Sequence, residues 1–502
     1  MTMPLRNVSA AAWPFRSVLI ANRGEIALRI LRSVKELGLQ AAVVYHAADA
    51  GSPAVRAADH AVEITGRTPV AAYLDGTQII AAAKQVGAGA IHPGYGFLSE
   101  NAGFARAASD AGLIFVGPTP DAIDLMGDKV RARAFVAKHG FPIAPSAIED
   151  DDPATFTERA AKVGFPILIK PAAGGGGKGM RIVREASALP EELARTRSEG
   201  QRYFGDGRLY VERYVENPRH IEVQVLGDAH GNVVHLYERE CSVQRRFQKI
   251  IEETPSPALS ADERTRICAA AAGIARAAGY RNAGTVEFIY GKGEFYFLEM
   301  NTRLQVEHPV TEMVTGVDLV REQLRVAAGE PLGYGQADIK TQGHAIECRI
   351  YAESPARGFT PTTGPILALR VPAGEGVRVD SGIVQGRPVT AAFDPMLAKV
   401  IVHGRDRNES RARAHAALGH FVLLGCETNT GFLRRLVDHQ AFAEGQIHTG
   451  FLDAHPEIAA EPPLSADTRA KLLAVAALSQ RAVRDAADKV PPLYAAMGGW
   501  RN

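Results

Sequence analysis

The segment 284–303, GTVEFIYGKGEFYFLEMNTR, constrains the fold more than any other stretch of the chain. Two apolar runs flank Gly291-Lys292-Gly293, a pattern typical of a β-hairpin. With a three-residue loop, Tyr290 pairs with Glu294 and Glu287 pairs with Phe297. Paired side chains lie on the same side of a sheet, and side chains alternate along each strand. The segment therefore predicts an antiparallel pair with one polar face and one apolar face.

The two faces of this hairpin differ in their residues. The polar face is predicted to carry Glu287, Glu299 and, if the second strand continues, Asn301, Arg303 and Gln305. The apolar face is predicted to carry Phe288, Tyr296 and Leu298. A two-residue turn would reverse the parity of one strand and weaken this assignment.

The polar face has the chemistry of a site for a metal ion and a nucleotide. Two carboxylates that lie close together repel, so one pKa rises unless a cation lies between them. Glu287, Glu299 and the amide oxygen of Asn301 are hard oxygen donors, which suit Mg²⁺ or Mn²⁺ on nucleotide phosphates. Arg303 can hold an anion with two hydrogen bonds, and Glu307 can take a proton if burial raises its pKa. The alternative is a solvated strand face with incidental charges.

A run of glycines follows another strand upstream. Lys170 ends the apolar segment FPILIK, and Gly174, Gly175, Gly176 and Gly177 come soon after it. The bare backbone N–H groups of such a loop can approach phosphate oxygens closely. The spacing is not that of a Walker A loop, because no Gly-Lys-Ser/Thr opens a helix. We expect a phosphate-binding loop, with a flexible surface loop as the alternative.

The order of the predicted elements indicates an α/β protein, α+β overall, with several domains. Segment 17–45 has the pattern strand, helix, strand, which predicts a parallel sheet. Its turn has the single glycine Gly24, so the dinucleotide-binding fingerprint is absent. We expect an N-terminal domain at 16–128, a small module at 141–214, a large strand-rich domain at 215–453 and a helical tail at 454–502.

Composition limits the class of protein. A chain of 502 residues is too long for one core. Its 57 basic and 56 acidic residues balance, so no field of one sign predicts a nucleic acid or a membrane surface as partner. No apolar run approaches the ~20 residues that cross a bilayer. The four cysteines lack metal-ligand spacing, which predicts reduced thiols in a cytoplasmic protein.

Eight stretches carry a resemblance to a known family. They are IANRGEIALRI, AIHPGYGFLSEN, LMGDKV, GGGGKGM, YVENPRHIEVQV, ERECSVQRR, EMNTRLQVEHPVTEM and ECRI, and they extend over roughly residues 16 to 453. Together they resemble the biotin carboxylase component of biotin-dependent carboxylases. The resemblance implies an ATP-grasp fold with an N-terminal parallel-sheet (Rossmann-like) domain, a mobile glycine-rich lid and a large C-terminal antiparallel sheet.

The resemblance also implies roles for individual residues. Those implied to bind ATP are Lys129, Lys170, Gly174, Gly175, Gly176, Gly177, Glu212, Val215, His220, Gln244, Glu287 and Glu299. Those implied to bind the metal ions are Glu287, Glu299 and Asn301. The implied bicarbonate pocket consists of Lys249, Arg303, Gln305 and Val306. The implied biotin side carries Arg349 and Tyr95, with Glu100 beside them. The implied catalytic residues are Arg303, Lys249 and Glu307, and Glu307 is the base.

The implied reaction uses ATP, Mg²⁺ (or Mn²⁺) and biotin. Bicarbonate attacks the γ-phosphate and gives carboxyphosphate and ADP, while metal ions and lysines offset the charge. Carboxyphosphate then releases CO₂, and the phosphate formed takes the proton from the ureido nitrogen of biotin. Arg303 would stabilise the resulting anion. The lid would exclude water, which destroys carboxyphosphate.

Two positions depart from the family pattern. Phe247 stands where the bacterial enzyme has a histidine near the nucleotide ribose, and a phenyl ring cannot donate a hydrogen bond there. Glu375 replaces an aromatic residue of the family's dimer contact, although Arg32, Glu36 and Arg378 match that contact. A homo-oligomer therefore stays open as a prediction.

Biotin must come from elsewhere, because the chain has no Met-Lys or Lys-Met pair at which the family attaches it. The expected partners are a biotin carboxyl carrier domain and a carboxyltransferase subunit. GQIHTGFLDAH and MGGWRN resemble the α subunits of methylcrotonyl- or propionyl-CoA carboxylases, so the tail is expected to lead to a linking domain. The alternatives are the biotin carboxylase part of pyruvate carboxylase, another ATP-grasp ligase, or a non-catalytic ATP-binding module.

Overall fold

The computed structural model describes residues 13–149, 152–171, 180–204 and 206–487. Its contacts divide the chain into two units, 1–458 and 459–502. The second unit contains helix α17 (Ala466–Ala487). Among the described helices, none combines the length and the apolar character that a membrane span requires.

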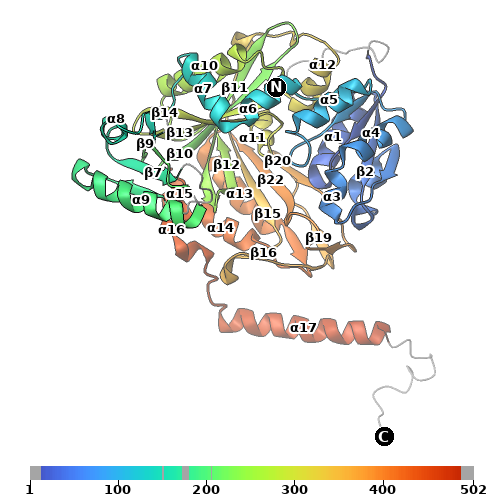
Figure 1. Cartoon of the computed structure of the whole chain (residues 1–502). Coiled ribbons are helices and arrows are strands. Elements are labelled where there is room, and N and C mark those ends of the chain that lie inside the picture. Colours follow the sequence, from blue (N-terminus) through green and yellow to red (C-terminus); the bar gives the residue numbers. More distant parts are fainter. Residues whose placement is uncertain (1–12, 150–151, 172–179, 205, 488–502) are drawn as a thin grey trace, which may run out of the picture. The chain divides into compact units, whose positions relative to one another are not determined.

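The N-terminal part of the first unit is a parallel five-stranded sheet in the order β3-β2-β1-β4-β5 (Figure 1). Its strands are β1 (Ser17–Ile20), β2 (Gln40–Tyr45), β3 (His60–Glu63), β4 (Ala90–His92) and β5 (Ile114–Phe115). Its helices are α1 (Gly24–Glu36), α2 (Pro53–Ala57), α3 (Pro69–Tyr73), α4 (Gly76–Gln85) and α5 (Ala102–Asp110). The predicted parallel sheet is confirmed.

A second, smaller sheet lies between residues 146 and 213 and has its own hydrophobic cluster. Its antiparallel strands are β6 (Ser146–Ile148), β9 (Leu209–Arg213), β7 (Ile167–Pro171) and β8 (Arg181–Val183), in that spatial order. Helices α8 (Phe156–Lys162) and α9 (Leu189–Phe204) accompany it (Figure 1). We call residues 141–214 the lid segment. Its predicted glycine run, Gly174–Gly177, lies outside the described residues.

The largest sheet is antiparallel and has eight strands in the order β14-β13-β10-β11-β12-β15-β22-β20. Their bounds are β10 (Arg219–Gly227), β11 (Val233–Arg245), β12 (Gln248–Thr254), β13 (Asn282–Gly291), β14 (Glu294–Asn301), β15 (His344–Tyr351), β20 (Val377–Ser381) and β22 (Met396–Gly404). The predicted hairpin around Gly227–Gly231 is confirmed as β10 and β11. The predicted antiparallel C-terminal sheet is confirmed as well.

The remaining elements surround this sheet. The helices are α6 (Pro120–Gly127), α7 (Lys129–Lys138), α10 (Ala261–Ala277), α11 (His308–Thr315), α12 (Leu319–Ala327), α13 (Arg407–His420), α14 (Thr430–Asp438), α15 (Gln440–Ala443) and α16 (Phe451–Ala454). Three small sheets pair β16 (Glu353–Ser354) with β17 (Thr360–Pro361), β18 (Gly364–Pro365) with β21 (Pro388–Val389), and β19 (Ala368–Arg370) with β23 (Val422–Leu424).

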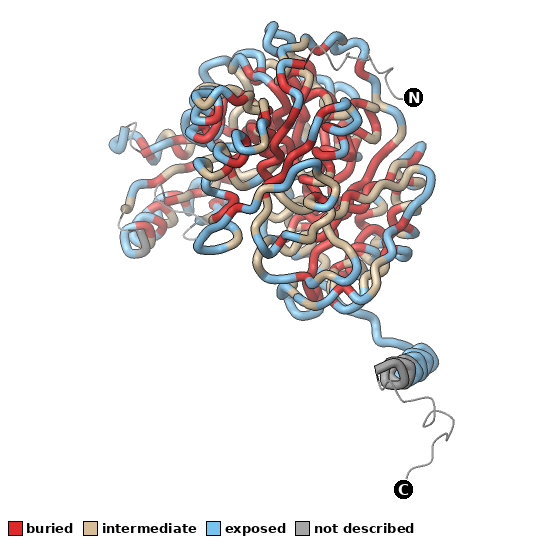
Figure 2. Tube along the Cα trace, turned by 90° about the vertical axis from the view of Figure 1, so that its right-hand side faces the viewer, coloured by how far each residue is buried: buried red, intermediate tan, exposed pale blue. Residues whose placement is uncertain are grey.

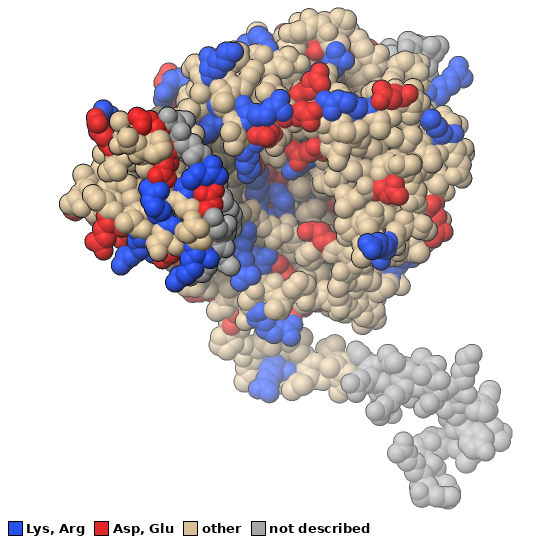
Figure 3. Space-filling view, viewed as in Figure 1, with Lys and Arg blue, Asp and Glu red and all other residues tan. Residues whose placement is uncertain are grey.

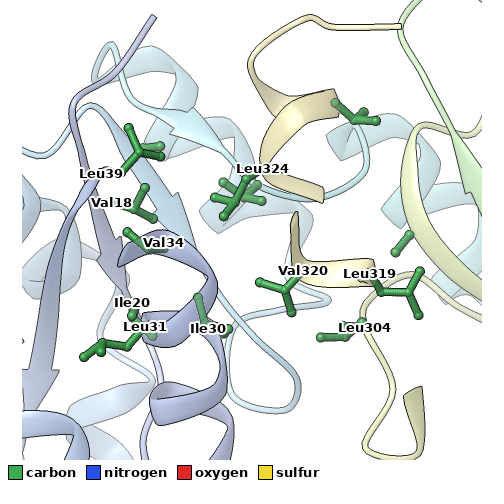
Figure 4. Packing of buried hydrophobic residues seen from close by; sticks show 14 of the residues in the cluster. Val18, Ile20, Ile30, Leu31, Val34, Leu39, Leu304, Leu319, Val320 and Leu324 are labelled. Carbon is green, nitrogen blue, oxygen red and sulfur yellow. The ribbon is translucent and has the colours of Figure 1, made fainter. Parts of the chain in front are cut away.

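Helix α1 shows how the apolar pattern builds the core. Ile26, Ile30 and Val34 recur at helical spacing and are almost completely buried. Figure 4 shows Ile30 and Val34 beside residues of β1, with Val320 and Leu324 of α12 facing them. A segment from a distant part of the sequence thus completes the core of the N-terminal sheet. Buried residues follow the strands of the sheets through the interior of the unit (Figure 2).

Candidate active site

The hairpin of β13 and β14 has a two-residue turn, so the predicted three-residue loop is wrong. Gly291 pairs with Glu294, which leaves only Lys292 and Gly293 in the turn. Their φ angles are 53° and 82°. Positive φ at both central residues is the geometry whose twist matches that of the flanking strands. Glu287 does not pair with Phe297 as predicted, because Phe297 lies opposite Phe288.

A β-bulge restores the polar face that the shorter turn would have disrupted. The register shifts by one residue between Glu287 and Phe288, so that Glu287 lies directly opposite Glu299. Asn301 is then opposite Thr285, on the same face. The bulge adds one residue to β14 and compensates for the residue that the turn lacks. The two carboxylates therefore share a face, as predicted. The cause is a two-residue turn combined with a bulge, and not the three-residue loop that was predicted.

The apolar face of β14 carries different residues from those predicted. Phe295 and Phe297 are buried in the same hydrophobic cluster as Phe288. Tyr296 is only half-buried, and Leu298 is 45% exposed. Leu298 lies at the bulge and lines the cleft described next. The prediction for Tyr296 and Leu298 was wrong, because it followed the parity of a three-residue loop.

A large cleft opens between the lid segment and the body of the first unit. Its volume is about 1710 Å³, and Lys and Arg side chains gather in the hollowed part of the face drawn in Figure 3. All described residues with a predicted binding or catalytic role line it. These are Lys129, Lys170, Glu212, Val215, His220, Gln244, Glu287, Glu299, Asn301, Arg303, Gln305, Val306, Glu307, Lys249, Arg349 and Tyr95.

Lys249 connects the acids at the floor of the cleft. Its Nζ donates to Oε1 of Glu287 at 2.9 Å and to Oε1 of Glu307 at 2.6 Å, and it also contacts Glu222. Burial would lower the pKa of Lys249, but these three carboxylates hold it well above its usual range. Lys249 is therefore a permanent cation. Glu222 is fully buried on β10 and is a site residue that sequence reasoning missed.

The sequence predicted that Glu307 could act as a base if burial raised its pKa, but the pKa of Glu307 is lowered. Glu307 is fully buried, and burial alone would raise its pKa. Lys249 and Arg349 outweigh burial and hold the pKa of Glu307 well below the usual range of a glutamate. Arg349 donates from Nη2 to Oε2 of Glu307 at 2.8 Å. The carboxylate is therefore ionised and able to accept a proton, and its two cationic partners control its basicity.

Arg303 lines the cleft with Lys249 and Glu307, and its planar guanidinium is available to bind an anion there. Its Nε donates to Oε2 of Glu100 at 2.8 Å, and its Nη1 donates to Oε1 of Gln305 at 2.8 Å. Its Nη2 contacts Oδ1 of Asn301 at 3.2 Å. Glu100, which the sequence placed near Arg349 and Tyr95, thus contacts Arg303 directly.

Both predicted phosphate-binding lysines pair with acids of the cleft. Lys129 opens α7, and its Nζ lies 2.6 Å from Oε2 of Glu299. Lys170 is in β7 and pairs with Glu212 of the neighbouring strand β9. A cation thus already contacts each of these carboxylates in the described residues. The arrangement brings a predicted phosphate-binding group next to a predicted metal ligand.

His220 and Gln244 occupy the side of Glu287 that faces away from Glu299. Nε2 of His220 lies 2.8 Å from Oε2 of Glu287. Gln244 contacts Nδ1 of His220 at 2.7 Å. Burial would lower the pKa of His220, but the charge of Glu287 raises it. The pair helps to hold Glu287 in place.

Phe247 occupies the tip of the hairpin between β11 and β12. Arg245 pairs with Gln248, so Arg246 and Phe247 form a two-residue turn with φ angles of 49° and 67°. Phe247 is 88% exposed and lines the cleft. A bulky residue seldom adopts a positive φ. The departure noted from sequence therefore places an exposed aromatic ring at the edge of the cleft.

Another cluster outside the cleft has the donor spacing of a metal site, but hydrogen bonds account for it. Nε2 of His439 and Nδ1 of His455 lie 3.2 and 3.3 Å from Oε1 of Glu457. Nδ1 of His439 accepts the N–H of Ala441, so in the neutral ring Nε2 carries the proton and donates to Glu457. A metal ion on Nε2 would require the opposite tautomer.

Glu252 of β12 and Glu347 of β15 lie directly opposite each other, and both are fully buried. Arg349 donates to Oε1 of Glu252 at 2.6 Å. Within the described residues, neither oxygen of Glu347 has a hydrogen-bond partner. Burial raises the pKa of Glu347 well above its usual range; the charge of Glu252 raises it further, although Lys399 opposes this. The protonated form of Glu347 is therefore favoured well beyond the usual glutamate range.

The variant Glu347→Gln is expected to gain stability relative to the wild type as the pH rises from about 5 to about 8. The raised pKa stabilises the fold below the ordinary glutamate range, and this contribution is lost as the pH rises towards the folded pKa. Glutamine keeps the shape and cannot ionise. Each unit of pKa difference corresponds to about 1.4 kcal/mol. The measurement is the unfolding midpoint of both proteins at the two pH values.

Glu253→Gln is the control for this prediction. Although burial opposes it, hydrogen bonds from His344 and Arg407 lower the pKa of Glu253 to about 2. The stability that ionised Glu253 contributes is present above the ordinary glutamate range and disappears only as the pH falls towards about 2. Glu253→Gln should therefore destabilise the protein equally at about pH 5 and at about pH 8. A pH-independent difference between Glu347→Gln and the wild type would contradict the raised pKa of Glu347.

Three family models match consecutive parts of the chain. The biotin carboxylase N-terminal domain matches residues 14–123, and the biotin carboxylase C-terminal domain matches residues 347–454. Between them, the ATP-binding domain of the carbamoyl-phosphate synthase L chain matches residues 128–334. The first match covers the parallel sheet, the second covers the lid segment and the hairpin of β13 and β14, and the third covers the end of the large sheet.

Relatives match over most of the chain. Biotin carboxylase of Haemophilus influenzae is 48% identical over 438 residues, which are 87% of this chain and 98% of that protein. The chain belongs to the biotin carboxylase family. A pyruvate carboxylase component of Methanothermobacter thermautotrophicus is 47% identical, with 88% and 90% covered. The alpha subunit of mitochondrial methylcrotonoyl-CoA carboxylase of Arabidopsis thaliana is 48% identical over 87% of this chain, but only 60% of its own length is matched.

A solved structure supports the ATP-grasp assignment. The biotin carboxylase domain dimer of Hydrogenobacter thermophilus 2-oxoglutarate carboxylase, in complex with MgADP, ADP and bicarbonate, superimposes with a TM-score of 0.80. It is 43% identical, and the match covers 89% of this chain and 99% of that one. The predicted ATP-grasp biotin carboxylase fold is confirmed.

Proposed function

We propose that this chain carboxylates biotin on a carrier domain with ATP and bicarbonate, using the residues of the cleft in the roles given below. The observation that carries the proposal is the position of Glu307. It lies fully buried between Lys249 and Arg349, and Lys249 also holds the metal-binding candidate Glu287. Lys249 thus connects Glu307, the proposed proton acceptor, with Glu287, a proposed ligand of the metal ion on ATP.

Glu287, Glu299 and Asn301 fit the divalent ion that the family uses. The two carboxylates face each other across the hairpin, and each now contacts a lysine ammonium, at 2.9 Å for Glu287 and 2.6 Å for Glu299. Each of the two carboxylates thus already stabilises a positive charge. Mg²⁺ or Mn²⁺ would neutralise charge on the triphosphate during phosphoryl transfer. Lys129 and Lys170, with the loop Gly174–Gly177, would bind the phosphates.

The remaining nucleotide contacts would come from the lid segment and β10. Glu212 and Val215 are proposed to bracket the adenine, and His220 and Gln244 to lie towards the ribose. All four line the cleft. The interaction of His220 with Glu287 would connect the sugar side to the metal side.

Bicarbonate would bind among Lys249, Arg303, Gln305 and Val306. The anion competes with Glu307 for the ammonium of Lys249, which weakens the contact that keeps the pKa of Glu307 low. Substrate binding would in this way make Glu307 a better base where the proton is removed. Arg303, already oriented by Glu100 and Gln305, would hold the anion and later stabilise the biotin enolate.

Biotin would approach along Arg349 and Tyr95, carried by a separate carrier domain. A carboxyltransferase subunit would use the product, and an acyl-CoA is the acceptor that we propose. Residues 454–502 would lead to a linking domain. The buried, unpaired cysteines accord with a cytoplasmic protein. The related biotin carboxylase domain of Hydrogenobacter thermophilus forms a dimer, which supports a homo-oligomer of this chain as well.

The test is ADP release by the purified chain with and without bicarbonate and free biotin. We expect hydrolysis that depends on bicarbonate and increases with biotin. Another ATP-grasp ligase would not respond to biotin, and a non-catalytic ATP-binding module would show no turnover. Either result would overturn the proposal.

A further inference from the structure

Lys399 is a buried cation that the sequence did not indicate as part of the site. It lies on β22 and has no exposed surface. Its Nζ donates to the backbone oxygen of Val306 at 2.7 Å. The same Nζ lies 3.1 Å from Oε1 of Glu25. Lys399 thus holds the carbonyl next to Glu307 from the far side of the anion pocket.

The contact continues into the N-terminal domain. Glu25 lies in the first turn of α1 and is 5% exposed. Its Oε1 accepts a hydrogen bond from the hydroxyl of Tyr95, which follows β4. The chain of contacts is therefore Tyr95 to Glu25, Glu25 to Lys399, and Lys399 to the oxygen of Val306. It joins the proposed biotin side to the proposed bicarbonate side through segments that are far apart in the sequence.

The surroundings of Lys399 explain why it stays charged. Burial would lower its pKa, but the charges of Glu25 and Asp380 raise it. Asp380 is held by Arg378 at 2.7 Å, and Glu347 has no hydrogen bond within the described residues. Glu25 and the carbonyl of Val306 contact the ammonium directly. A desolvated ammonium held in this way has few alternative positions, so a shift at one partner is transmitted to the other.

We propose that Lys399 is a positioning residue that couples the biotin side of the cleft, through Glu25 and Tyr95, to the geometry of the bicarbonate pocket at Val306. The proposal rests on the biotin carboxylation proposed above. Lys399 is not among the described residues that line the cleft. It holds the backbone of Val306 so that Glu307, the next residue, and Gln305, the preceding one, keep their orientation. Because coupling between two sites is reciprocal, bicarbonate should also affect how biotin binds.

The main test is Lys399→Met, assayed by ADP release over a range of bicarbonate concentrations, with and without free biotin. Methionine keeps much of the length and removes the charge. We expect the KM for bicarbonate to rise about fivefold, and the effect of biotin on that KM to shrink by a similar factor. The KM for ATP should stay within about twofold of the wild type, because none of the described nucleotide-side residues contacts Lys399.

Arg407→Met is the matched control. Arg407 of α13 is a largely buried cation that also bridges a carboxylate, Glu253 at 2.7 Å, and a backbone oxygen, that of Ala443 at 2.8 Å. It does not line the cleft. The variant Arg407→Met should be destabilised about as much as Lys399→Met, and its KM for bicarbonate should equal that of the wild type. An equal rise in both variants, or no rise in Lys399→Met, would overturn the proposal.

A second variant covers the case in which Lys399→Met does not fold. Glu25→Gln keeps the shape of the side chain and removes the charge that Lys399 contacts. It should raise the KM for bicarbonate, and Tyr95→Phe combined with it should add less than the sum of the single effects. Full additivity, or an unchanged KM in Glu25→Gln, would overturn the coupling. Failure of the wild type to need bicarbonate would instead overturn the proposed function.

Discussion

Glu307→Gln is expected to lower kcat for bicarbonate-dependent ADP release by about 10²- to 10⁴-fold, the range that a positioned base contributes. Glutamine keeps the shape of the side chain, but its single carbonyl oxygen can replace only one of the two oxygens that accept from Lys249 and Arg349, because its NH2 group donates. It cannot take the proton of bicarbonate. Because Lys249 and Arg349 hold the pKa of Glu307 low, the wild type should keep Glu307 ionised down to the acid side of the usual glutamate range. The measurement is ADP release at saturating ATP and bicarbonate.

Glu312→Gln is the control for this variant. Glu312 is a buried acid of α11, the helix that begins directly after Glu307, and it pairs with Arg29 at 2.9 Å and Arg378 at 2.7 Å. It should lower the unfolding midpoint, since it weakens two buried ion pairs, and leave kcat close to that of the wild type. Activity of Glu307→Gln within tenfold of the wild type, or equal losses in both variants, would refute Glu307 as the base.

Glu287→Gln and Glu299→Gln are expected to raise the Mg²⁺ concentration needed for half-maximal ADP release. Each variant replaces one of two carboxylates that lie directly opposite each other on β13 and β14. Loss of an outer partner of a metal ligand costs about 10- to 100-fold in affinity, and loss of a ligand itself should cost at least as much. Glu287 should show the larger effect, because Lys249, His220 and Asn301 all depend on it. A Mg²⁺ titration with ADP release as the readout measures this.

Glu253→Gln again provides the matched comparison. Glu253 is a buried acid on β12 of the same sheet, and its partners are His344 and Arg407. Its loss should lower stability without changing the Mg²⁺ requirement. If Glu287→Gln and Glu253→Gln shift the Mg²⁺ requirement alike, the hairpin does not hold the ion, and the proposed mechanism fails.

The alternation of side chains along the sequence was sufficient to predict a polar and an apolar face of the hairpin formed by β13 and β14. It was not sufficient to predict their register. The turn contains two residues rather than three, and the bulge at Leu298 that compensates for it has no local signal in the sequence. Glu287 and Glu299 were predicted on one face for a reason that turned out to be wrong. Tyr296 and Leu298 were misplaced by the same error.

The charges of the site depended even more on tertiary contacts. The sequence indicated Glu307 as a base if burial raised its pKa, but Lys249 and Arg349, 58 and 42 residues away, lower it. Lys399 lies in none of the matched stretches, and Glu222 and Glu347 lie in two of them, YVENPRHIEVQV and ECRI, without a role predicted for either. Each lies on a buried strand, and only the packing of neighbouring strands shows which partners it meets.

Taken alone, the sequence determined the family, the layers of the fold and the residue types of the cleft, because periodicity and motif spacing are local properties of the chain. The tertiary structure alone decided the register of the hairpin, the direction of the pKa shift of Glu307 and the contact of Lys399 with Val306. The physical reason is that an electrostatic interaction depends on the distance between charges in space and on their burial. The distances and the burial are set when segments that are far apart in the sequence pack together.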